Sequence, residues 1–439
     1  MSFNHLGVFA PLLANLKKLD FVTPTAVQEK VIPSVLAGRD VLATAQTGSG
    51  KTAAFMLPLL QQLVTSGAKV QSNQIRCLVL VPTRELAEQI FQASQAFSKN
   101  LPVRLGVAYG GVSINPQMMR LRKGLDVLIA TPGRLLDLVQ QNAVNFYALN
   151  HLVFDEADRM LDLGFAQEIN QLLRVFPRKK QTLLFSATLS DRVAELVKVL
   201  LQNPLKVAVN PINQAVNTVT QKIYTTDKKH KVDLFFYLLE QHAWQQAMIF
   251  VKTKKSAEKI TGLLREKGLA VDSIHGDKPQ AARLKALDSF KQGRVHYLVA
   301  TDVAARGLDI AQMPVVVNMD LPVVAQDYVH RIGRTGRAGE TGLAVSLVSA
   351  DEVELLLAIE QLQGRNFNRL EEPGFIAEHR VPATDLRLGV KKKPKKPKVK
   401  TAIDDPHSRI HLGDAFNQTP KVKNVRSKPS FLSGSNKKK

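Results

Sequence analysis

Short apolar runs rich in β-branched residues alternate with helical patterns along most of this sequence. A near-continuous apolar run of a few residues is typical of a strand that is buried on both faces of a sheet. Strands of this kind, separated by helices, form parallel sheets with helices on both sides. The pattern therefore predicts an α/β fold. The clearest runs are DVLATA, CLVLVPT, RLGVAYGG, DVLIATPG, HLVFDEAD, TLLFSAT and LKVAVNP in the first half, and QKIYTT, AMIFVKT, AVDSIHG, HYLVATD, VVVNMDLP and LAVSLVS in the second.

The alternation is interrupted by the polar stretch NPINQAVNTVTQ at residues 210–221. This stretch contains a proline and has no helical periodicity, so it is either a surface loop or a linker between domains. Because the strand–helix pattern is repeated on both sides, we favour the linker. We predict two open α/β domains, at residues 1–208 and 209–380.

Residues 381–439 have a different composition and include the run KKKPKKPKVK. Residues 380–439 contain 17 Lys and Arg against 4 Asp and Glu, which is more than half of the chain's formal net charge of +22. Such a segment cannot build a core, so we expect a disordered tail. The charge indicates a polyanionic partner, either nucleic acid or an acidic membrane surface, and a tail that only adds solubility is the alternative.

The single cysteine, Cys77, lies in the apolar run IRCLVLV. One cysteine excludes an internal disulfide and a cluster of thiolate metal ligands. The sequence has no N-terminal basic-then-apolar signal and no apolar run of about 18 residues. We therefore expect a cytoplasmic protein that does not associate with a membrane.

The stretch DVLATAQTGSGKT predicts a strand, a Gly-rich turn and the start of a helix. Backbone N–H groups around Gly48, Ser49 and Gly50 suit phosphate oxygens, because they lie at a helix N-terminus. Lys51 would supply a charge to the outer phosphates and Thr52 a hydroxyl to a magnesium ion. The general pattern of such loops begins with Gly, and here Ala45 stands at that position.

Three carboxylates follow another apolar run, in HLVFDEADRM. A magnesium nucleotide requires a carboxylate at a strand end, and Asp155 has that place, as a ligand directly or through water. Glu156 would then orient or deprotonate the attacking water. An acidic cluster favoured by a helix N-terminus is the alternative, but it does not explain the partnership with a phosphate loop.

Ten motifs in order give the chain a specific resemblance. It resembles the DEAD-box ATP-dependent RNA helicases, and most closely the bacterial members with a short core and a basic tail. The likeness runs from about residue 3 to residue 339, and Ala45 is usual in this family. Asp20 stands where the family usually has Gly, and we expect only a small local effect. The motifs are FVTPTAVQ, AQTGSGKT, PTRELA, GG, TPGR, DEAD, SAT, HGD, ATDVAARGLD and HRIGRTGR.

The resemblance implies two tandem RecA-like domains with parallel sheets, and ATP and Mg²⁺ bound in the cleft between them. Phe21 and Gln28 match a motif that reads adenine, with Phe3 as its upstream aromatic residue, and Asp309 matches the ribose contact. The implied cofactor-binding residues are Phe3, Phe21, Gln28, Ala45, Gln46, Thr47, Gly48, Ser49, Gly50, Lys51, Thr52 and Asp309. The implied catalytic residues are Lys51, Asp155, Glu156, His330, Arg334 and Arg337, with Thr52 and Asp155 on the metal.

The resemblance also implies how nucleotide and RNA communicate. The hydroxyls of Ser186 and Thr188 are expected to bond the acids of DEAD, with Asp158 as the partner. Arg334 and Arg337 match arginine fingers that stabilise charge on the transferred phosphate, and His330 matches a residue that contacts the DEAD and SAT elements.

Several motifs follow strands and are expected along one face, where they match family positions that hold the RNA backbone. Such contacts imply weak sequence preference. The implied RNA-binding residues are Arg84, Gly110, Gly111, Thr131, Gly133, Arg134, Gln280, Arg283 and Thr301.

We therefore predict an ATP-dependent RNA helicase that hydrolyses ATP to unwind short RNA duplexes or remodel RNA–protein complexes. An ATP-gated RNA clamp and a DNA-directed motor are the alternatives, and the motif FVTPTAVQ together with DEAD disfavours the second. Candidate partners are RNA, ribosomal precursors and RNA-decay proteins. The core is expected to be monomeric.

Overall fold

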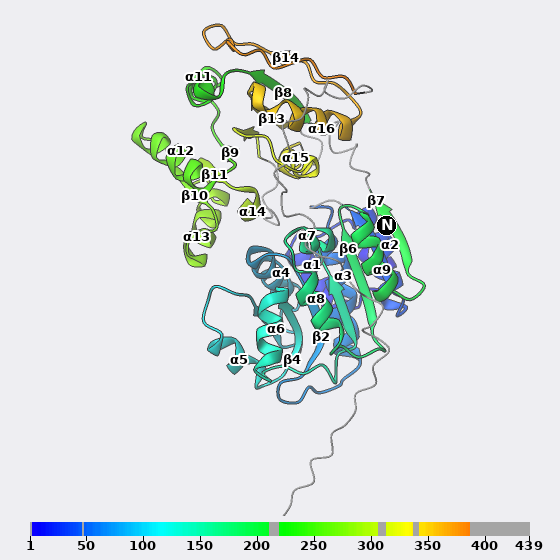
Figure 1. Cartoon of the computed structure of the whole chain (residues 1–439). Coiled ribbons are helices and arrows are strands. Elements are labelled where there is room, and N and C mark those ends of the chain that lie inside the picture. The colour runs from blue at the N-terminus through cyan, green and yellow to red at the C-terminus, as the bar shows by residue number, and fades with distance from the viewer. Residues whose placement is uncertain (1, 46–47, 210–218, 306–312, 337–341, 387–439) are drawn as a thin grey trace, which may run out of the picture.

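The computed structural model describes residues 2–45, 48–209, 219–305, 313–336 and 342–386. Figure 1 shows two α/β units, the first coloured blue to green and the second green to orange. The predicted linker lies almost wholly outside the described residues, as does the tail from residue 387. The predicted domain boundaries therefore remain predictions, while the two tandem RecA-like folds are confirmed.

The first unit is a parallel sheet of 7 strands in the order β3-β4-β2-β5-β6-β1-β7, with helices on both faces. Its strands are β1 (Val41–Ala45), β2 (Ile75–Leu80), β3 (Leu105–Ala108), β4 (Leu125–Ala130), β5 (His151–Phe154), β6 (Gln181–Ser186) and β7 (Leu205–Val209). Its helices are η1 (Phe3–Leu6), α1 (Ala10–Lys18), α2 (Ala26–Leu36), α3 (Lys51–Thr65), α4 (Arg84–Phe97), α5 (Asn115–Leu121), α6 (Pro132–Gln140), α7 (Ala157–Asp162), α8 (Ala166–Leu173) and α9 (Asp191–Leu200).

The second unit is also a parallel sheet of 7 strands, in the order β10-β11-β9-β12-β13-β8-β14. Its strands are β8 (Val219–Thr225), β9 (Ala247–Phe250), β10 (Val271–Ile274), β11 (Tyr297–Ala300), β12 (Val315–Asn318), β13 (Gly342–Val348) and β14 (Arg369–Leu370). Its helices are η2 (Lys228–His230), α11 (Lys231–Gln241), α12 (Lys254–Glu266), α13 (Gln280–Lys291), α14 (Asp302–Ala305), α15 (Ala325–Ile332), η3 (Ala350–Glu352) and α16 (Val353–Gln363).

The continuous apolar runs are explained by burial on both faces of each sheet. In β2, Cys77 and Val79 belong to the hydrophobic cluster on one face, and Leu78 and Leu80 belong to the cluster on the other. Burial raises the pKa of the Cys77 thiol to about 12. Because all strands of a sheet are parallel, their carboxyl ends share one edge, where ligands of such sheets bind.

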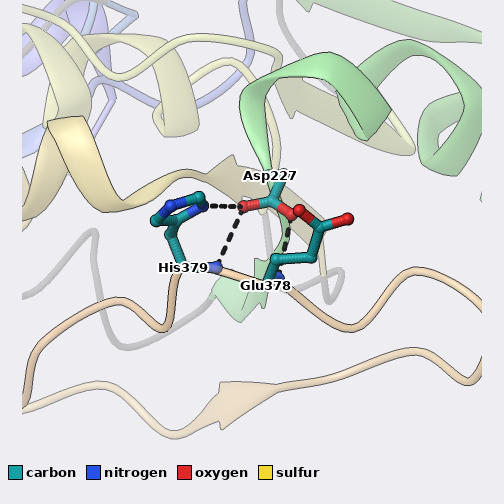
Figure 2. A group of neighbouring side chains, drawn as sticks. All are labelled: Asp227, Glu378 and His379. Atoms are coloured by element: carbon teal, nitrogen blue, oxygen red, sulfur yellow. Dashed lines mark hydrogen bonds and ion pairs between the residues drawn. The ribbon is translucent and has the colours of Figure 1, made fainter.

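The chain after α16 is fastened to the second unit, as Figure 2 shows. The backbone N–H groups of Glu378 and His379 donate to the carboxylate of Asp227, over 2.9 and 3.3 Å. The bond from Glu378 lowers the pKa of Asp227. These contacts hold the described end of the chain close to the carboxyl end of β8.

In the described part of the chain, no helix combines the length and the apolar character that crossing a lipid bilayer requires.

Candidate functional site

The Gly-rich turn between β1 and α3 has the backbone that the sequence predicts. Gly48 and Gly50 have φ of 80° and 89°, a left-handed conformation that favours glycine. A Cβ atom on Gly50 would lie 2.5 Å from Nε2 of Gln28. Lys51 begins α3 and is buried, and its Nζ donates to the carbonyl of Ala45 over 2.9 Å. Gln46 and Thr47 lie outside the described residues.

Gln28 joins this turn to the start of α2. Its Oε1 accepts from the backbone N–H of Thr25 at 2.8 Å, and its Nε2 donates to the carbonyl of Gly50 at 3.1 Å. The hydroxyl of Thr25 donates to the carbonyl of Ser49 at 2.8 Å. One lone pair and one N–H of the amide remain for a ligand. The T-x-x-Q spacing is that of a capping box, a signal that the sequence analysis missed.

The aromatic residues expected near adenine lie together. The rings of Phe3 and Phe21 have centroids 6.5 Å apart; Phe3 is buried, whereas Phe21 is 36% exposed and offers a face to a ligand. Asp20, which precedes Phe21, has a φ of 57°. The family's Gly at this position is thus explained by a left-handed backbone, which Asp tolerates better than most residues.

The carboxylates of the predicted metal and water site are buried at the carboxyl end of β5. Burial raises the pKa of Asp155 to about 6, and the nearby Lys51 ammonium opposes that shift. Glu156 has a φ of 55°, which is strained for a residue other than glycine, and its backbone N–H donates to Oδ1 of Asp155 at 3.1 Å. A buried carboxylate of this kind gains from a cation, and together with the half-buried Thr52 hydroxyl it provides the oxygen ligands that Mg²⁺ prefers.

Asp158 contacts the SAT turn after β6. Its Oδ2 accepts from the backbone N–H of Ala187 and from both the backbone N–H and the hydroxyl of Thr188, at 3.1, 2.9 and 2.9 Å. The hydroxyl of Ser186 instead donates to the carbonyl of Thr188 at 2.6 Å. The expectation that both hydroxyls bond the acids is therefore wrong for Ser186, which fixes the turn that presents Thr188.

The second unit contributes α15 and the residues after it. His330 is partly exposed, with Nδ1 3.7 Å from the carboxylate of Asp327 on the same helix. Arg334 is buried directly after α15, and its carbonyl accepts from the backbone N–H of Met313 at 3.0 Å. Arg337 and Asp309 lie outside the described residues.

Arg331, in the same motif, has a structural role. It donates to both carboxylate oxygens of Asp302, at 2.6 and 2.7 Å, and to Oδ1 of Asn318 at 3.0 Å. Its guanidinium lies 4.9 Å from the ring centroid of Phe250. Of the arginines spaced three apart in HRIGRTGR, this one is therefore used inside the second unit.

A pocket of about 500 Å³ lies between the two units and collects most of the predicted RNA residues. Its lining comes from the ends of β2, β3 and β4 and from the second unit. The lining residues are Pro82, Thr83, Arg84, Glu85, Gly110, Thr131, Gly133, Arg134, Asp137, Leu163, Phe165, Gly276 and Arg283.

Two arginines of the first unit shape this pocket. A Cβ atom on Gly111, where φ is 77°, would lie 1.9 Å from Nη1 of Arg84, so the guanidinium lies directly over the glycine backbone. Arg134 is buried, and its Nη2 donates to the carbonyl of Val112 at 3.0 Å. Among the described residues, Nη1 of Arg134 has no hydrogen-bond partner. Both arginines thus line the pocket, and Arg134 has a buried N–H donor that lacks an acceptor among the described residues.

The second unit reaches the pocket through Arg283. Its Nη2 lies 2.9 Å from Oε1 of Glu85 on α4, which is a direct ion pair between the two units. Burial lowers the pKa of Arg283, and Glu85 opposes that shift. Glu85 and Gly276 were not among the predicted residues, although both lie inside predicted motifs.

Three predicted RNA residues are not part of this lining: Gly111, Gln280 and Thr301. Gly111 lies beneath Arg84, and Thr301 is buried, with its backbone N–H donating to the carbonyl of Ile274 at 3.2 Å. Gln280 is also buried, and its amide oxygen and nitrogen have no hydrogen-bond partner among the described residues.

Two family models and several known proteins match this chain. Residues 25–197 match the family model described as DEAD/DEAH box helicase, and residues 230–339 match the model described as helicase conserved C-terminal domain. The ATP-dependent rRNA helicase RRP3 of Yarrowia lipolytica is 41% identical over 368 residues, 84% of this chain and 76% of that protein. The protein of the same name from Gibberella zeae is 42% identical and covers 83% of this chain and 74% of its own.

Solved structures of two proteins, Dbp5 and Mss116p, also resemble this chain. Dbp5 of S. cerevisiae bound to RNA and ADP BeF3 is 31% identical, with a TM-score of 0.73, and the match covers 84% of this chain and 95% of that one. Mss116p bound to ssRNA and AMP-PNP is 27% identical, with a TM-score of 0.75, and the match covers 85% and 80% of the two chains.

Proposed function

The chain belongs to the DEAD-box family of ATP-dependent RNA helicases, and on this premise we propose how its residues divide ATP hydrolysis and RNA binding between them. The observation that carries the proposal is the pair of buried acids, Asp155 and Glu156, at the carboxyl end of β5 beside Lys51. A buried acid pair next to a buried lysine at the end of a Gly-rich turn suits a charged, metal-bound phosphate chain.

The nucleotide is held by the first unit. The N–H groups of the turn at Gly48, Ser49 and Gly50 bind phosphate oxygens, and Lys51 turns from the Ala45 carbonyl to the outer phosphates. Thr52 and Asp155 would hold Mg²⁺, which neutralises charge on the phosphates when it is bound. The remaining residues of this site are proposed around the base and the sugar: Phe3, Phe21, Gln28, Ala45, Gln46, Thr47 and Asp309.

Glu156 orients and deprotonates the attacking water. Its left-handed backbone turns the side chain away from the helical path of α7, which begins at the next residue. Arg334 and Arg337, together with His330, complete the site from the second unit when the two units close on the nucleotide. Hydrolysis then depends on the relative position of the units, which RNA in the pocket between them stabilises.

RNA lies in the pocket between the units. Arg84, Arg134 and Arg283 contact its phosphates, and backbone groups at Gly110, Thr131 and Gly133 approach closely because their side chains are small. Asp158 connects the two sites, since it follows the catalytic acids and contacts Thr188. Gln280 and Thr301 would contact RNA only after a rearrangement. In it, RNA or a closer approach of the two units would supply hydrogen-bond partners for the side-chain amide of Gln280.

We propose structured ribosomal RNA precursors as the substrate class. The supporting observation is that the curated relatives named above carry the description ATP-dependent rRNA helicase. A strand-displacement assay with short RNA duplexes, with and without ATP, measures unwinding directly. ATP-dependent retention of RNA without displacement would favour a clamp instead.

Glu156→Gln tests the chemistry. It preserves size and polarity but removes the base, so single-turnover ATP hydrolysis at saturating RNA should fall by roughly 100-fold or more while ATP binding persists. Glu195→Gln, an exposed position on α9, is the matched control and should hydrolyse ATP at the parent rate. Near-parent hydrolysis by Glu156→Gln would remove Glu156 from the mechanism.

A further inference from the structure

A long stretch of the first unit carries positive charge and no acidic residue. Residues 89–125 contain no Asp or Glu, but they contain Lys99, Arg104, Arg120, Arg122 and Lys123. Apart from Lys99, these cations lie directly before β3, in α5 or in the turn that follows α5, and all of them are exposed. We call Arg104, Arg120, Arg122 and Lys123 the basic edge, because β3 is the edge strand of the first sheet.

The basic edge lies at the amino end of β3, whereas the RNA pocket lies past the carboxyl end of the same strand. Gly110, two residues after β3, lines the pocket. From there α5 leads away from the pocket: Nε2 of Gln117 donates to the carbonyl of Tyr109 at 3.2 Å, and at the far end the carbonyl of Leu121 accepts from the backbone N–H of Asn73 at 3.0 Å. The helix is thus fixed at both ends along the rim that leaves the pocket.

The cations at the far end are held in place. Arg104 has a side chain 48% exposed, and its guanidinium donates to the carbonyl of Lys123 and, at 3.4 Å, to the carbonyl of Val70. Its one nearby acid is Asp126, which is buried and already accepts from Arg76 at 2.9 and 2.7 Å. Arg104 therefore has only a long ion pair, of 3.9 Å between its Nε and Oδ2 of Asp126, and its half-exposed side chain also faces solvent.

The other three cations differ from Arg104 in having no acidic partner among the described residues. Within the described residues, no ion pair within 4.0 Å joins Arg120, Arg122 or Lys123 to a carboxylate. Arg122 instead donates to Sδ of Met119 at 3.6 Å. Three of the four cations of the basic edge are therefore uncompensated, and such a row attracts a repeating anion more than it stabilises the fold.

We propose that the basic edge binds the phosphate backbone of RNA that extends past the pocket. From Ala108, beside the pocket, to Arg104 is about 13 Å at roughly 3.3 Å per residue of strand, a distance that a few nucleotides span. This inference rests on the placement of RNA in the pocket proposed above. RNA is favoured over an acidic protein because β3 leads from the pocket to these cations, and a row of cations suits the evenly spaced charges of a phosphate backbone.

The test compares two lengths of RNA in the full chain with an ATP analogue. The variant R120Q/R122Q/K123Q removes three charges from the basic edge. The matched control R192Q/K198Q/K206Q removes three exposed charges from α9 and β7, at the opposite edge of the same sheet. The probes are single-stranded oligouridines of about 6 and about 20 nucleotides, a range that brackets common site sizes.

Binding is measured at three salt concentrations. For the long probe, the basic-edge variant should flatten the slope of log affinity against log salt by roughly 2, at about 0.7 for each lost phosphate contact on a single strand. The short probe and the control variant should behave like the parent chain. An unchanged slope for the long probe, or an equal loss in the control, would overturn the proposal and leave the edge to an acidic protein.

Arg84→Gln separates this proposal from the placement of RNA in the pocket. It should weaken both probes, because Arg84 lines the pocket. If neither probe responds to Arg84→Gln, the pocket assignment fails, whereas the long-probe slope of R120Q/R122Q/K123Q still decides the basic edge. Unchanged thermal melting of all variants shows that the differences arise from binding and not from unfolding.

Discussion

The two units have the same topology but use it differently. Taken in chain order, each sheet has its third, fourth, second, fifth, sixth, first and seventh strands side by side. Equivalent positions can therefore be compared directly. The sheet edge that binds ligands occurs twice, yet the catalytic acids and the Gly-rich turn of the proposed nucleotide site belong to the first unit.

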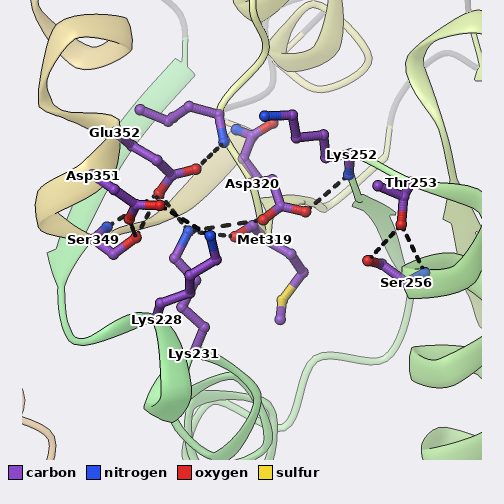
Figure 3. A network of polar contacts seen from close by, with 12 residues as sticks. Lys228, Lys231, Lys252, Thr253, Ser256, Met319, Asp320, Ser349, Asp351 and Glu352 are labelled. Atoms are coloured by element: carbon purple, nitrogen blue, oxygen red, sulfur yellow. Dashed lines mark hydrogen bonds and ion pairs between the residues drawn. The ribbon is translucent and has the colours of Figure 1, made fainter. Parts of the chain in front are cut away.

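The lysine at the start of the first crossover helix shows the difference. Lys51 begins α3 after β1, and Lys231 begins α11 soon after β8. Lys51 donates to a carbonyl of its own loop. Lys231 donates to the carbonyl of Met319 at 2.9 Å and to Oε2 of Glu352 at 2.5 Å, and it lies 4.0 Å from Oδ1 of Asp320 (Figure 3). The ammonium group of Lys231 is thus fully engaged by acceptors of the protein itself.

The carboxylates after the fifth strand differ in the same way. Asp155 follows β5 and is buried with a raised pKa. Asp320 follows β12 by two residues; its Oδ2 accepts from the backbone N–H of Lys252 at 2.8 Å, and Lys231 lies nearby (Figure 3). The shared topology thus places a lysine and a carboxylate at equivalent positions in both units. The neighbouring residues decide whether these charges bind a ligand or stabilise the fold.

The two lysines should differ most in their contribution to ATP hydrolysis. Lys51→Met should reduce RNA-stimulated ATP hydrolysis on the order of 100-fold or more, as does the loss of a group that stabilises developing charge. Lys231→Met should hydrolyse ATP near the parent rate for each folded molecule. Steady-state ATPase assays with saturating RNA compare the two, and a similar loss in both variants would show that the lysines are not functionally different.

The two lysines should also differ in their contribution to the unfolding free energy. Lys231→Met leaves Glu352 buried without its ion-pair partner, which should cost about 3–5 kcal/mol of unfolding free energy in the second unit. Trp244, the single tryptophan, is buried in the second unit, so its fluorescence follows urea unfolding there. Lys229→Met, which removes an exposed pair with Glu378, is the control and should leave the transition unchanged. A stable Lys231→Met variant would contradict the structural role.

A third difference concerns acid sensitivity. His151 begins β5, whereas Val315 begins the equivalent strand β12. Burial lowers the pKa of His151 to about 4. The unfolded chain takes up this proton near pH 6.5, so the unfolding free energy of the first unit falls as pH drops from about 6.5 to 4, by about 3 kcal/mol over the whole window.

His151→Val should remove that acid sensitivity by introducing the residue of the second unit. Urea unfolding followed by far-UV circular dichroism at pH 7 and pH 4.5 gives the change for the transition that Trp244 does not report. The comparison between the two pH values cancels the packing change, including the lost bond to Gln181 at 3.2 Å. An equal loss in the parent and variant would rule His151 out as the source.

The last and weakest effect concerns one glycine of each unit, Gly111 after β3 and Gly262 in α12. Gly111→Ala would strain a positive φ and displace Arg84, so RNA affinity should fall roughly five-fold, equivalent to about 1 kcal/mol. In the second unit, a Cβ atom on Gly262, in α12, meets nothing within 4 Å, and Gly262 does not line the pocket. Gly262→Ala should therefore bind RNA like the parent. Equal affinities for both variants would show that Arg84 does not need the glycine beneath it.

Most strands could be predicted because burial on both faces leaves a continuous apolar run. Each predicted run from DVLATA to LAVSLVS contains or overlaps a strand of the structure. The exception is β14, which was not predicted because it has 2 residues and pairs only at the sheet edge. The local motifs likewise located the Gly-rich turn and the acids, because their residues are neighbours in sequence.

Contacts between distant residues could not be predicted. Lys231 and Glu352 are 121 residues apart and meet only because α11 and η3 flank the end of β12. The ion pair between Arg283 and Glu85 depends on how the two units are placed. Arg331 carries the same residue type and spacing as Arg334, and only its contacts with Asp302, Asn318 and Phe250 distinguish it.

The buried thiol of Cys77 makes it possible to measure, by chemical modification, how often the first unit opens. A thiol with a pKa near 12 is almost wholly protonated at neutral pH, and an alkylating reagent reacts with the thiolate. Modification therefore requires an opening of the central strand β2, and its rate follows how often the first unit opens. Because no other cysteine is present, this rate reports on one half of the chain while nucleotide and RNA are added or removed.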